Sequence, residues 1–430
     1  MSDDGENWEA LPLTRAKAKD DDEYEHLLEI LLCLAVHHIA MALALDKEKD
    51  DEDEHEETRL LFHEPPKYAS RQSIPLPEFS TWQYLIDSSD ETDETWFTWV
   101  GLSKISFLAL VNECEPYWKA NAQVAIRGEH AVGTPRPQSI GKRLLNCTGT
   151  MAITLKWLTC TSDFDDIAKS FGLVVTVARK YVMFGIDIIV EKLFNHDFCR
   201  VEWRVHDEEY LEHMSELTYY YVPELSEDWG LKPVAWIDAV RLPIANKWSR
   251  PRERREDQSG EKKMTLRKCI LLSDPCGKIV GFVLNMPGSW GDSKGARIGG
   301  LYDMINALLD RYNLVSDAAY AGHLLNAKII KVLKEGQRIP DGMTDETLIE
   351  VEKLIRHARQ PAEWTNRDFV ASFKQLRQIL GIHDDIHSKL MLASILLQNW
   401  RVATCDWNQV KKVFQILREN ARRDAEIDDN

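Results

Sequence analysis

The chain has 430 residues, 44% of them hydrophobic, and a formal net charge of −17 at pH 7. This apolar fraction excludes a wholly disordered protein, and the length is enough for two or three domains with cores of their own. The negative charge is concentrated at one end, because residues 1–57 hold 19 acidic and 5 basic side chains, against 51 acidic and 48 basic in residues 58–430. The nearly neutral body therefore does not exclude a nucleic-acid partner.

The N-terminal segment is acidic and polar, and shows no cleavable signal peptide. Its apolar stretch at residues 27–45 contains Glu29, His37 and His38, and three polar side chains make a membrane span costly. We therefore expect a buried or partner-facing helix there and no membrane attachment. The acidic run that follows is typical of a disordered, solvated linker.

The next part of the chain has the periodicity of helices and contains a first functional signal. Ala168, Gly172 and Val177 have the spacing of a helix-turn-helix, in which a small residue lets two helices approach, glycine takes the turn and a hydrophobic residue packs back. Arg179 and Lys180 would then lie on the second helix and could contact DNA. A plain helical hairpin with a solvated basic face fits the same spacing.

From about residue 231 the pattern changes to strands, two of which end on an aspartate. The run KPVAWIDAV carries Asp238; a hairpin and an amphipathic helix follow, and the short strand NLVSDAAY carries Asp317. Strand ends in an α/β sheet can lie side by side, so these carboxylates can converge. Close carboxylates repel each other unless a cation lies between them, and hard oxygen ligands select Mg²⁺ or Mn²⁺ over zinc. The sequence thus predicts a divalent-metal site.

A third carboxylate comes from the segment RHARQPAEWTNRDFVASFKQLRQIL, which reads as a long helix. Glu363 is the first choice and Asp368 the alternative. Each of these acids alone would more often be a helix cap or a solvated strand end. It is their order and context together that favour a metal site.

The order of these segments resembles the DDE endonuclease domain of PIF/Harbinger-type transposases and of the host proteins derived from them. WIDAVRLPI matches the family's first strand with its P-I pair, MPGSWGDS its PGSxxDS segment, SDAAY its D-x-x-[YF] strand end, and the helix with Glu363 its R-x-x-x-E-W and F-x-x-L pattern. The most specific short match is Pro287–Ser293. Ala239 and Ala319 depart from the pattern, since many members have glycine at both places.

The resemblance implies an α/β protein with an RNase H-like mixed sheet flanked by helices, preceded by an all-helical region with a helix-turn-helix. It implies that Asp238, Asp317 and Glu363 are catalytic and hold two Mg²⁺ or Mn²⁺ ions for phosphodiester hydrolysis and strand transfer. Asp292 would support the metal ligands or position substrate, or else cap a helix. The predicted function is a transposase or a host nuclease derived from one; the alternative is a catalytically silent DNA-binding or scaffold protein.

A basic segment at residues 246–268 lies between the first two predicted strands and holds nine lysines and arginines. It could follow DNA phosphates, with binding that weakens in salt. Interspersed acids dilute its charge, so a mobile solvated loop is the alternative. The predicted DNA-binding residues are Arg179, Lys180, Lys247, Arg250, Arg252, Arg254, Arg255, Lys262 and Lys263.

Four parts are predicted along the chain: an acidic, partly disordered tail with one apolar helix (1–90), the helical region (91–225), the endonuclease domain (226–415) and a charged C-terminal tail (416–430). The resemblance also implies DNA as a partner and the nucleus as the location. It implies a separate Myb/SANT-like protein that supplies DNA binding and nuclear import. A homo-oligomer is a further expectation.

Overall fold

The computed structural model describes residues 80–88, 92–121, 143–245, 255–260 and 264–428, except for short gaps at 323, 325–326, 335, 338, 340–341, 379–383 and 406–407. These residues all belong to one compact unit, Ile74–Asn430. The helix predicted at residues 27–45 lies outside them. Within the described ranges, no helix is long and apolar enough to cross a membrane.

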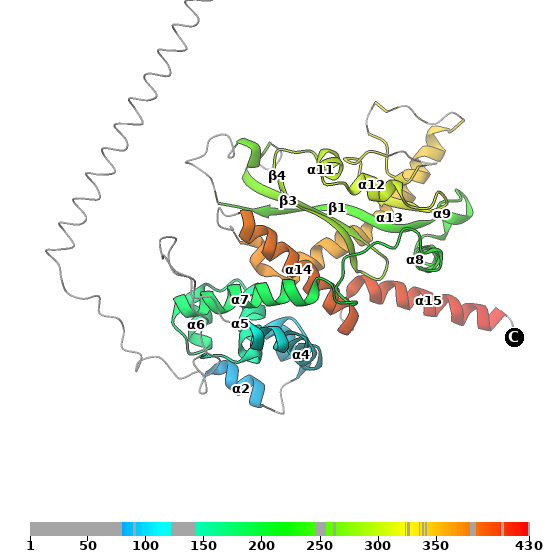
Figure 1. The fold of residues 1–430 in the computed structure, drawn as a ribbon. Coiled ribbons are helices and arrows are strands. Elements are labelled where there is room, and N and C mark those ends of the chain that lie inside the picture. The colour runs from blue at the N-terminus through cyan, green and yellow to red at the C-terminus, as the bar shows by residue number, and fades with distance from the viewer. Residues whose placement is uncertain are drawn as a thin grey trace, which may run out of the picture. The chain divides into compact units, whose positions relative to one another are not determined.

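The first part of this unit is helical, as predicted (Figure 1). Ser80, Thr92 and Ser103 cap the first three helices, since each side-chain oxygen accepts a hydrogen bond from a backbone N–H of the first turn. Trp96 and Phe107 are fully buried and pack against each other at the centre. The helices are α2 (Thr81–Asp87), α3 (Asp93–Val100), α4 (Lys104–Ala120), α5 (Cys147–Thr159), α6 (Phe164–Ser170) and α7 (Val175–Leu193).

Helices α6 and α7 are joined by a short turn at the predicted place, an arrangement that a helix-turn-helix and a plain helical hairpin share. Ala168 is buried between the helices, and Gly172 in the turn has a φ of +63°, a left-handed conformation that glycine adopts without strain. Val177 on α7 packs back against the core. Arg179 is exposed, with its guanidinium 5.1 Å from the centre of the Phe164 ring.

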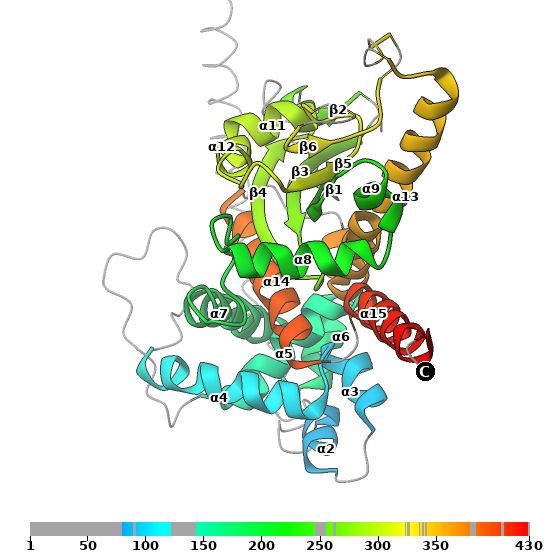
Figure 2. The ribbon, with the colours of Figure 1, turned by 90° about the vertical axis from the view of Figure 1, so that its right-hand side faces the viewer.

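The second part of the unit is built on a six-stranded mixed sheet (Figures 1 and 2). The strands lie in the order β4-β3-β1-β5-β6, with β2 also paired to β3. The pairs β1–β3, β2–β3 and β3–β4 are antiparallel, whereas β1–β5 and β5–β6 are parallel. The strands are β1 (Pro233–Pro243), β2 (Gln258–Ser259), β3 (Met264–Ser273), β4 (Ile279–Pro287), β5 (Asn313–Ser316) and β6 (Ile329–Ile330). This arrangement is consistent with the RNase H-like fold that was predicted.

Helices cover both faces of the sheet, with α11 and α12 on one side and α14 on the other (Figure 1). The Trp236 indole anchors α13 by donating a hydrogen bond to the Ala358 carbonyl at 2.5 Å. The helices are α8 (Glu208–Tyr219) and α9 (Pro223–Glu227) before β1; α11 (Asp292–Ile298) and α12 (Leu301–Asn306) between β4 and β5; and α13 (Asp345–Ser372), the 3-10 helix η4 (Lys374–Arg377), α14 (Asp384–Thr404) and α15 (Gln409–Asp428) after β6.

Alternation along β3 joins two cores. Cys269 and Leu271 belong to a core shared with the helical region and α14, whereas Ile270 and Leu272 belong to a core with α8, α11, α12, α13 and α15. Successive side chains of a strand point to opposite faces, so one central strand serves both cores. The helical region is therefore packed onto the sheet through a continuous apolar core.

Candidate active site

Two aspartates lie beside each other in the sheet, one on β1 and the other directly after the neighbouring parallel strand β5. Ile237 lies opposite Ser316, so the next residue along each strand is Asp238 on one side and Asp317 on the other. Each carboxylate also accepts a hydrogen bond from a backbone N–H one or two residues further on, at 2.8 and 2.7 Å. The sheet thus places side by side two carboxylates that are 79 residues apart in the sequence.

The two alanines that replace family glycines lie directly beside these acids. The backbone N–H of Ala239 donates to Asp238, and that of Ala319 donates to Asp317. Among the described residues, Asn285 is the non-glycine residue with a positive φ, so neither alanine adopts a conformation that requires glycine. The substitutions therefore leave the backbone of the site unstrained.

Burial and like charge both act on Asp238. Burial raises the pKa of its carboxyl, and the charges of Asp317 and Asp292 raise the pKa further, while the Ala239 N–H and the guanidinium of Arg359 lower it. Carboxylates that repel one another in a partly buried site are stabilised by a cation between them. Hard oxygen donors of this kind fit Mg²⁺ or Mn²⁺.

Tyr320 lies within reach of the same acids. Its side chain is 2% exposed, and its hydroxyl finds no hydrogen-bond partner among the described residues. Burial raises the pKa of Tyr320 well above its ordinary value, and the charges of Asp292, Asp238 and Asp317 raise it further. Buried polar groups are normally hydrogen-bonded, so this hydroxyl is an unusual feature beside the two acids.

Asp292 is held by a lysine from the sheet. Its Oδ1 lies 2.9 Å from the Nζ of Lys268 on β3, and both side chains are buried. Asp292 is the first residue of α11, whose N-cap position is Gly291 without a side-chain cap bond. The alternative role as a helix cap is therefore not observed, and the carboxylate belongs to a buried ion pair beside the site.

Ser293 from the MPGSWGDS segment ties α11 to the loop after Asp317. Its hydroxyl lies 2.8 Å from the Tyr302 hydroxyl on α12, and that hydroxyl accepts a hydrogen bond at 2.9 Å from the backbone N–H of Ala321. The sequence match was specific at this segment, but it did not indicate the bridge through Tyr302. The bridge connects two of the matched motifs in space.

Helix α13 presents an amide to Asp238. Asn366 donates a hydrogen bond from its Nδ2 to Asp238 Oδ2 at 3.0 Å. Glu363, one turn earlier on α13, is exposed and forms an ion pair with Arg359. Asp368 follows Asn366 by two residues, about 200° around the helix, and accepts a hydrogen bond from Gln398 of α14 at 2.8 Å.

The predicted third acid therefore does not join the two aspartates in this structure. Within the described part of the chain, no group of three or more His, Cys, Asp or Glu side chains is arranged to hold a metal. Sequence reasoning missed Asn366, which takes the place facing Asp238. Its spacing of three residues from Glu363 was the available signal, because residues three apart are neighbours on a helix.

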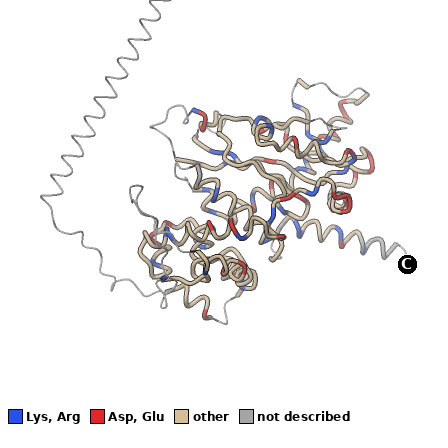
Figure 3. The backbone as a smooth tube through the Cα atoms, viewed as in Figure 1, with Lys and Arg blue, Asp and Glu red and all other residues tan. Residues whose placement is uncertain are grey.

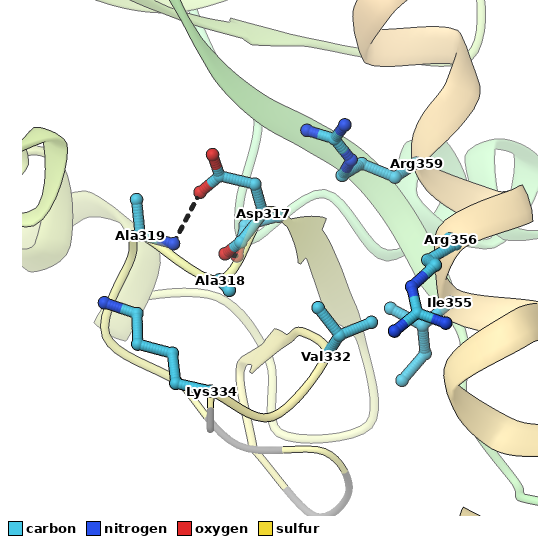
Figure 4. Close-up of a pocket in the computed structure, with 9 residues that line it drawn as sticks. Asp317, Ala318, Ala319, Val332, Lys334, Ile355, Arg356 and Arg359 are labelled. Carbon is cyan, nitrogen blue, oxygen red and sulfur yellow. Dashed lines mark hydrogen bonds between the residues drawn. The ribbon is translucent and has the colours of Figure 1, made fainter. Parts of the chain in front are cut away.

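A pocket of about 460 Å³ opens beside Asp317 (Figure 4). Two arginines reach it from α13, and one lysine reaches it from the segment after β6. Close by, the buried Lys331 has its pKa lowered by burial and by the charge of Lys334. The residues that line the pocket are Ser316, Asp317, Ala318, Ala319, Val332, Lys334, Ile355, Arg356 and Arg359.

Most of the predicted DNA-binding residues lie outside the described residues: Lys247, Arg250, Arg252, Arg254, Lys262 and Lys263. Arg255 is exposed, as is Arg179, and Lys180 is half-buried. The last two bases of the segment, Arg267 and Lys268, form ion pairs with buried aspartates. Figure 3 shows basic and acidic positions interspersed through the described elements. DNA contact by the predicted residues stays a prediction.

Comparison with known families identifies the domain that carries this site. Residues 237–399 match a family model described as DDE superfamily endonuclease. The match begins one residue before Asp238, ends within α14 and includes both Asp317 and Glu363. No curated protein and no solved structure matches the chain. Residues 237–399, which carry the two aspartates, are therefore similar to the DDE superfamily endonuclease family.

Proposed function

We propose that the chain is a metal-dependent DNA endonuclease of the PIF/Harbinger type, either a transposase or a host nuclease derived from one. The observation that carries the proposal is the pair Asp238 and Asp317, which the parallel strands hold side by side inside a DDE endonuclease domain. The raised pKa of Asp238, caused by burial and by neighbouring carboxylates, supports a cation as the missing partner.

The carboxylates of Asp238 and Asp317 would hold divalent cations, with Glu363 as the third acid. When bound, two Mg²⁺ or Mn²⁺ ions supply an activated nucleophile and stabilise the leaving oxygen of a phosphodiester. The chain's own contribution is rigid placement: two strands fix the aspartates, and α13 holds Asn366 against Asp238. Asp292 would support these groups from its buried pair with Lys268.

Glu363 is favoured over Asp368 as the third acid by its position on α13. Asp368 faces α14, where Gln398 donates a hydrogen bond to it, whereas Glu363 lies about one turn before Asn366, the residue that contacts Asp238. Glu363 is held by Arg359 in an ion pair whose side chains are 26% and 56% exposed. Exposed pairs contribute little free energy, so a divalent cation can take Glu363 from Arg359.

DNA is the proposed substrate, and the nucleus the proposed location. Arg179 and Lys180 on the helix-turn-helix and the basic segment at residues 246–268 would contact phosphates. A Myb/SANT-like partner protein and a homo-oligomer are proposals that the Harbinger-type likeness supports.

The test is Mn²⁺ binding by calorimetric titration of the full chain and of its Asp238→Asn and Glu363→Gln variants. We expect Asp238→Asn to weaken binding at least a hundredfold and Glu363→Gln at least tenfold. The matched control is Asp274→Asn, which changes a buried aspartate outside the site and should keep wild-type affinity. Equal affinity of Asp238→Asn and the wild type would contradict the proposal.

A catalytically silent scaffold is the second candidate, and a specific observation favours it. Asn366 occupies the position facing Asp238, and Arg359 binds Glu363, so the acids do not gather in this structure. A wild-type chain that binds no Mn²⁺, even with duplex DNA present, would select this function. Cleavage of duplex DNA that is lost in Asp238→Asn would exclude it.

A further inference from the structure

The pocket beside Asp317 has a strongly basic lining that the two-aspartate site does not use. Arg356 and Arg359 point from α13 into the space across from Asp317, and Lys334 extends along its other side toward Ala319 (Figure 4). Three cationic side chains therefore surround one carboxylate. If a cation neutralises Asp317, the pocket keeps its positive lining and is ready for an anion.

The existing partners of these cations do not fill the pocket. Arg356 lies 2.7 Å from Glu352, an exposed pair on the surface of α13 in which the arginine is 62% exposed. Glu352 also accepts a hydrogen bond from the backbone N–H of Leu333 at 3.1 Å. For Lys334, no ion pair is found within the described ranges. The pKa of Lys331 is lowered mainly by burial and further by the positive charge of Lys334. Positive charge is thus crowded at this edge of the sheet.

The size and remaining walls of the pocket fit part of a nucleotide. Its volume of about 460 Å³ lies within the range of small-molecule sites. Val332 and Ile355 form an apolar wall between the cations, which suits the carbon face of a sugar. Guanidinium groups bind phosphate oxygens through paired N–H donors, and lysine binds them as a point charge.

We propose that this pocket binds a phosphate group of the DNA strand, next to the phosphodiester on which Asp238 and Asp317 would act. The inference rests on the proposed function, because it takes the adjacent carboxylates as the cleavage site. Lys334 and Arg356 are its main ligands, and Arg359 joins them when Glu363 leaves it. The pocket would hold the strand in register with the acids and would do so for any base sequence.

The experiment measures binding of a fluorescently labelled duplex by anisotropy in Mn²⁺ over a range of salt concentrations. The test variant is Lys334→Gln with Arg356→Gln, which leaves Arg359 and its partner Glu363 intact. We expect binding about tenfold weaker for every duplex sequence, and a slope of log affinity against log salt that is smaller by about 1, the value for one lost phosphate contact.

The matched control is Lys353→Gln, an exposed lysine on the same helix that does not line the pocket. We expect its affinity within about twofold of the wild type, since Lys353 does not line the pocket and an exposed charge is partly screened by salt. Equal losses in the control and the double variant would overturn the inference. Titration of the double variant with Mn²⁺ tests for damage to the fold, because removing positive charge near Asp317 should not weaken cation binding. Loss of Mn²⁺ affinity in the double variant would therefore also overturn the inference.

Competition identifies the source of the phosphate. Inorganic phosphate and a deoxynucleoside monophosphate are added to the wild type and to the double variant. Displacement of DNA from the wild type alone, with the mononucleotide the better competitor, supports a DNA subsite. Binding of inorganic phosphate with no effect on DNA would overturn it. If DNA binding falls in the double variant but the wild type binds no Mn²⁺, the pocket inference holds and the proposed nuclease function fails. If the double variant binds DNA normally and the wild type binds Mn²⁺, the pocket inference fails and the nuclease function still holds.

Discussion

In two aspartates of this protein, burial raises the pKa of the carboxyl, but the groups that surround the two carboxyls differ. Asp274, in the turn between β3 and β4, is 2% exposed, and Asp238 is half-buried on β1; burial raises the pKa of both. The carboxylate of Asp274 accepts hydrogen bonds from the Tyr210 hydroxyl at 3.0 Å and from the Lys278 N–H at 2.9 Å. Asp238 also accepts two hydrogen bonds, from the Ala239 N–H and from Asn366, but in addition it lies near the carboxylates of Asp317 and Asp292.

The difference separates a structural aspartate from a functional one. The hydrogen-bond donors to Asp274 are the Tyr210 hydroxyl of α8 and the Lys278 N–H of its own turn, so the carboxylate stabilises the packing of α8 against this turn. Around Asp238, two further acids raise the pKa and Tyr320 leaves its hydroxyl unpaired. Burial alone does not mark an active site; like charges and an unpaired polar group do, because selection for stability alone would remove them.

The largest expected effect is on stability, and it should fall on Asp274. Asp274→Ala leaves the Tyr210 hydroxyl and the Lys278 N–H buried without an acceptor, so we expect the free energy of unfolding to fall by about 3 kcal/mol. Asp238→Asn should change it by less than about 1 kcal/mol, since relief of repulsion offsets one weakened hydrogen bond. Urea unfolding without metal measures both. A larger loss for Asp238→Asn would reverse the assignment of roles.

A smaller effect is expected from the tyrosines that accompany the two aspartates. Tyr210→Phe removes the hydrogen bond to Asp274 and should lower the free energy of unfolding by about 1 to 2 kcal/mol. Tyr320→Phe removes a hydroxyl that has no partner, so stability should stay unchanged or rise slightly. The same urea titration compares the two variants directly. A clear loss for Tyr320→Phe would mean that its hydroxyl is bonded, and the contrast would disappear.

The sheet and its two aspartates could be predicted because they depend on local pattern and strand order. Apolar runs predict buried strands, and their order brought Asp238 and Asp317 together. The predicted strand end at Asp238 was wrong, because β1 continues to Pro243 and Asp238 lies in its middle, opposite Leu271. The turn between α6 and α7 followed from the spacing of Ala168 and Gly172. Predicting these features does not require knowing which way each side chain points in the folded protein.

The rest of the site depends on which face each helix turns toward the sheet. Glu363 and Asn366 are three residues apart on α13, and the rotation of the helix decides that the amide meets Asp238 while the acid meets Arg359. The pair of Lys268 with Asp292 required the pairing of β3 and the position of α11. Such contacts join residues through tertiary packing, and a pattern of spacings in the sequence does not determine them.

The smallest expected effect is a pH dependence that belongs to Asp274. Its pKa is raised above the ordinary value of 3.8 by burial, more than its hydrogen bonds lower it, so the folded state holds this proton more tightly than the unfolded chain does. The contribution of the protonated carboxyl to stability is therefore complete below pH 3.8 and is lost as the pH rises through the folded pKa. Asp274→Asn has no such proton, so its stability relative to the wild type should rise with pH above 3.8. Urea unfolding of both proteins across that range measures the trend; a constant difference between them would contradict the raised pKa of Asp274.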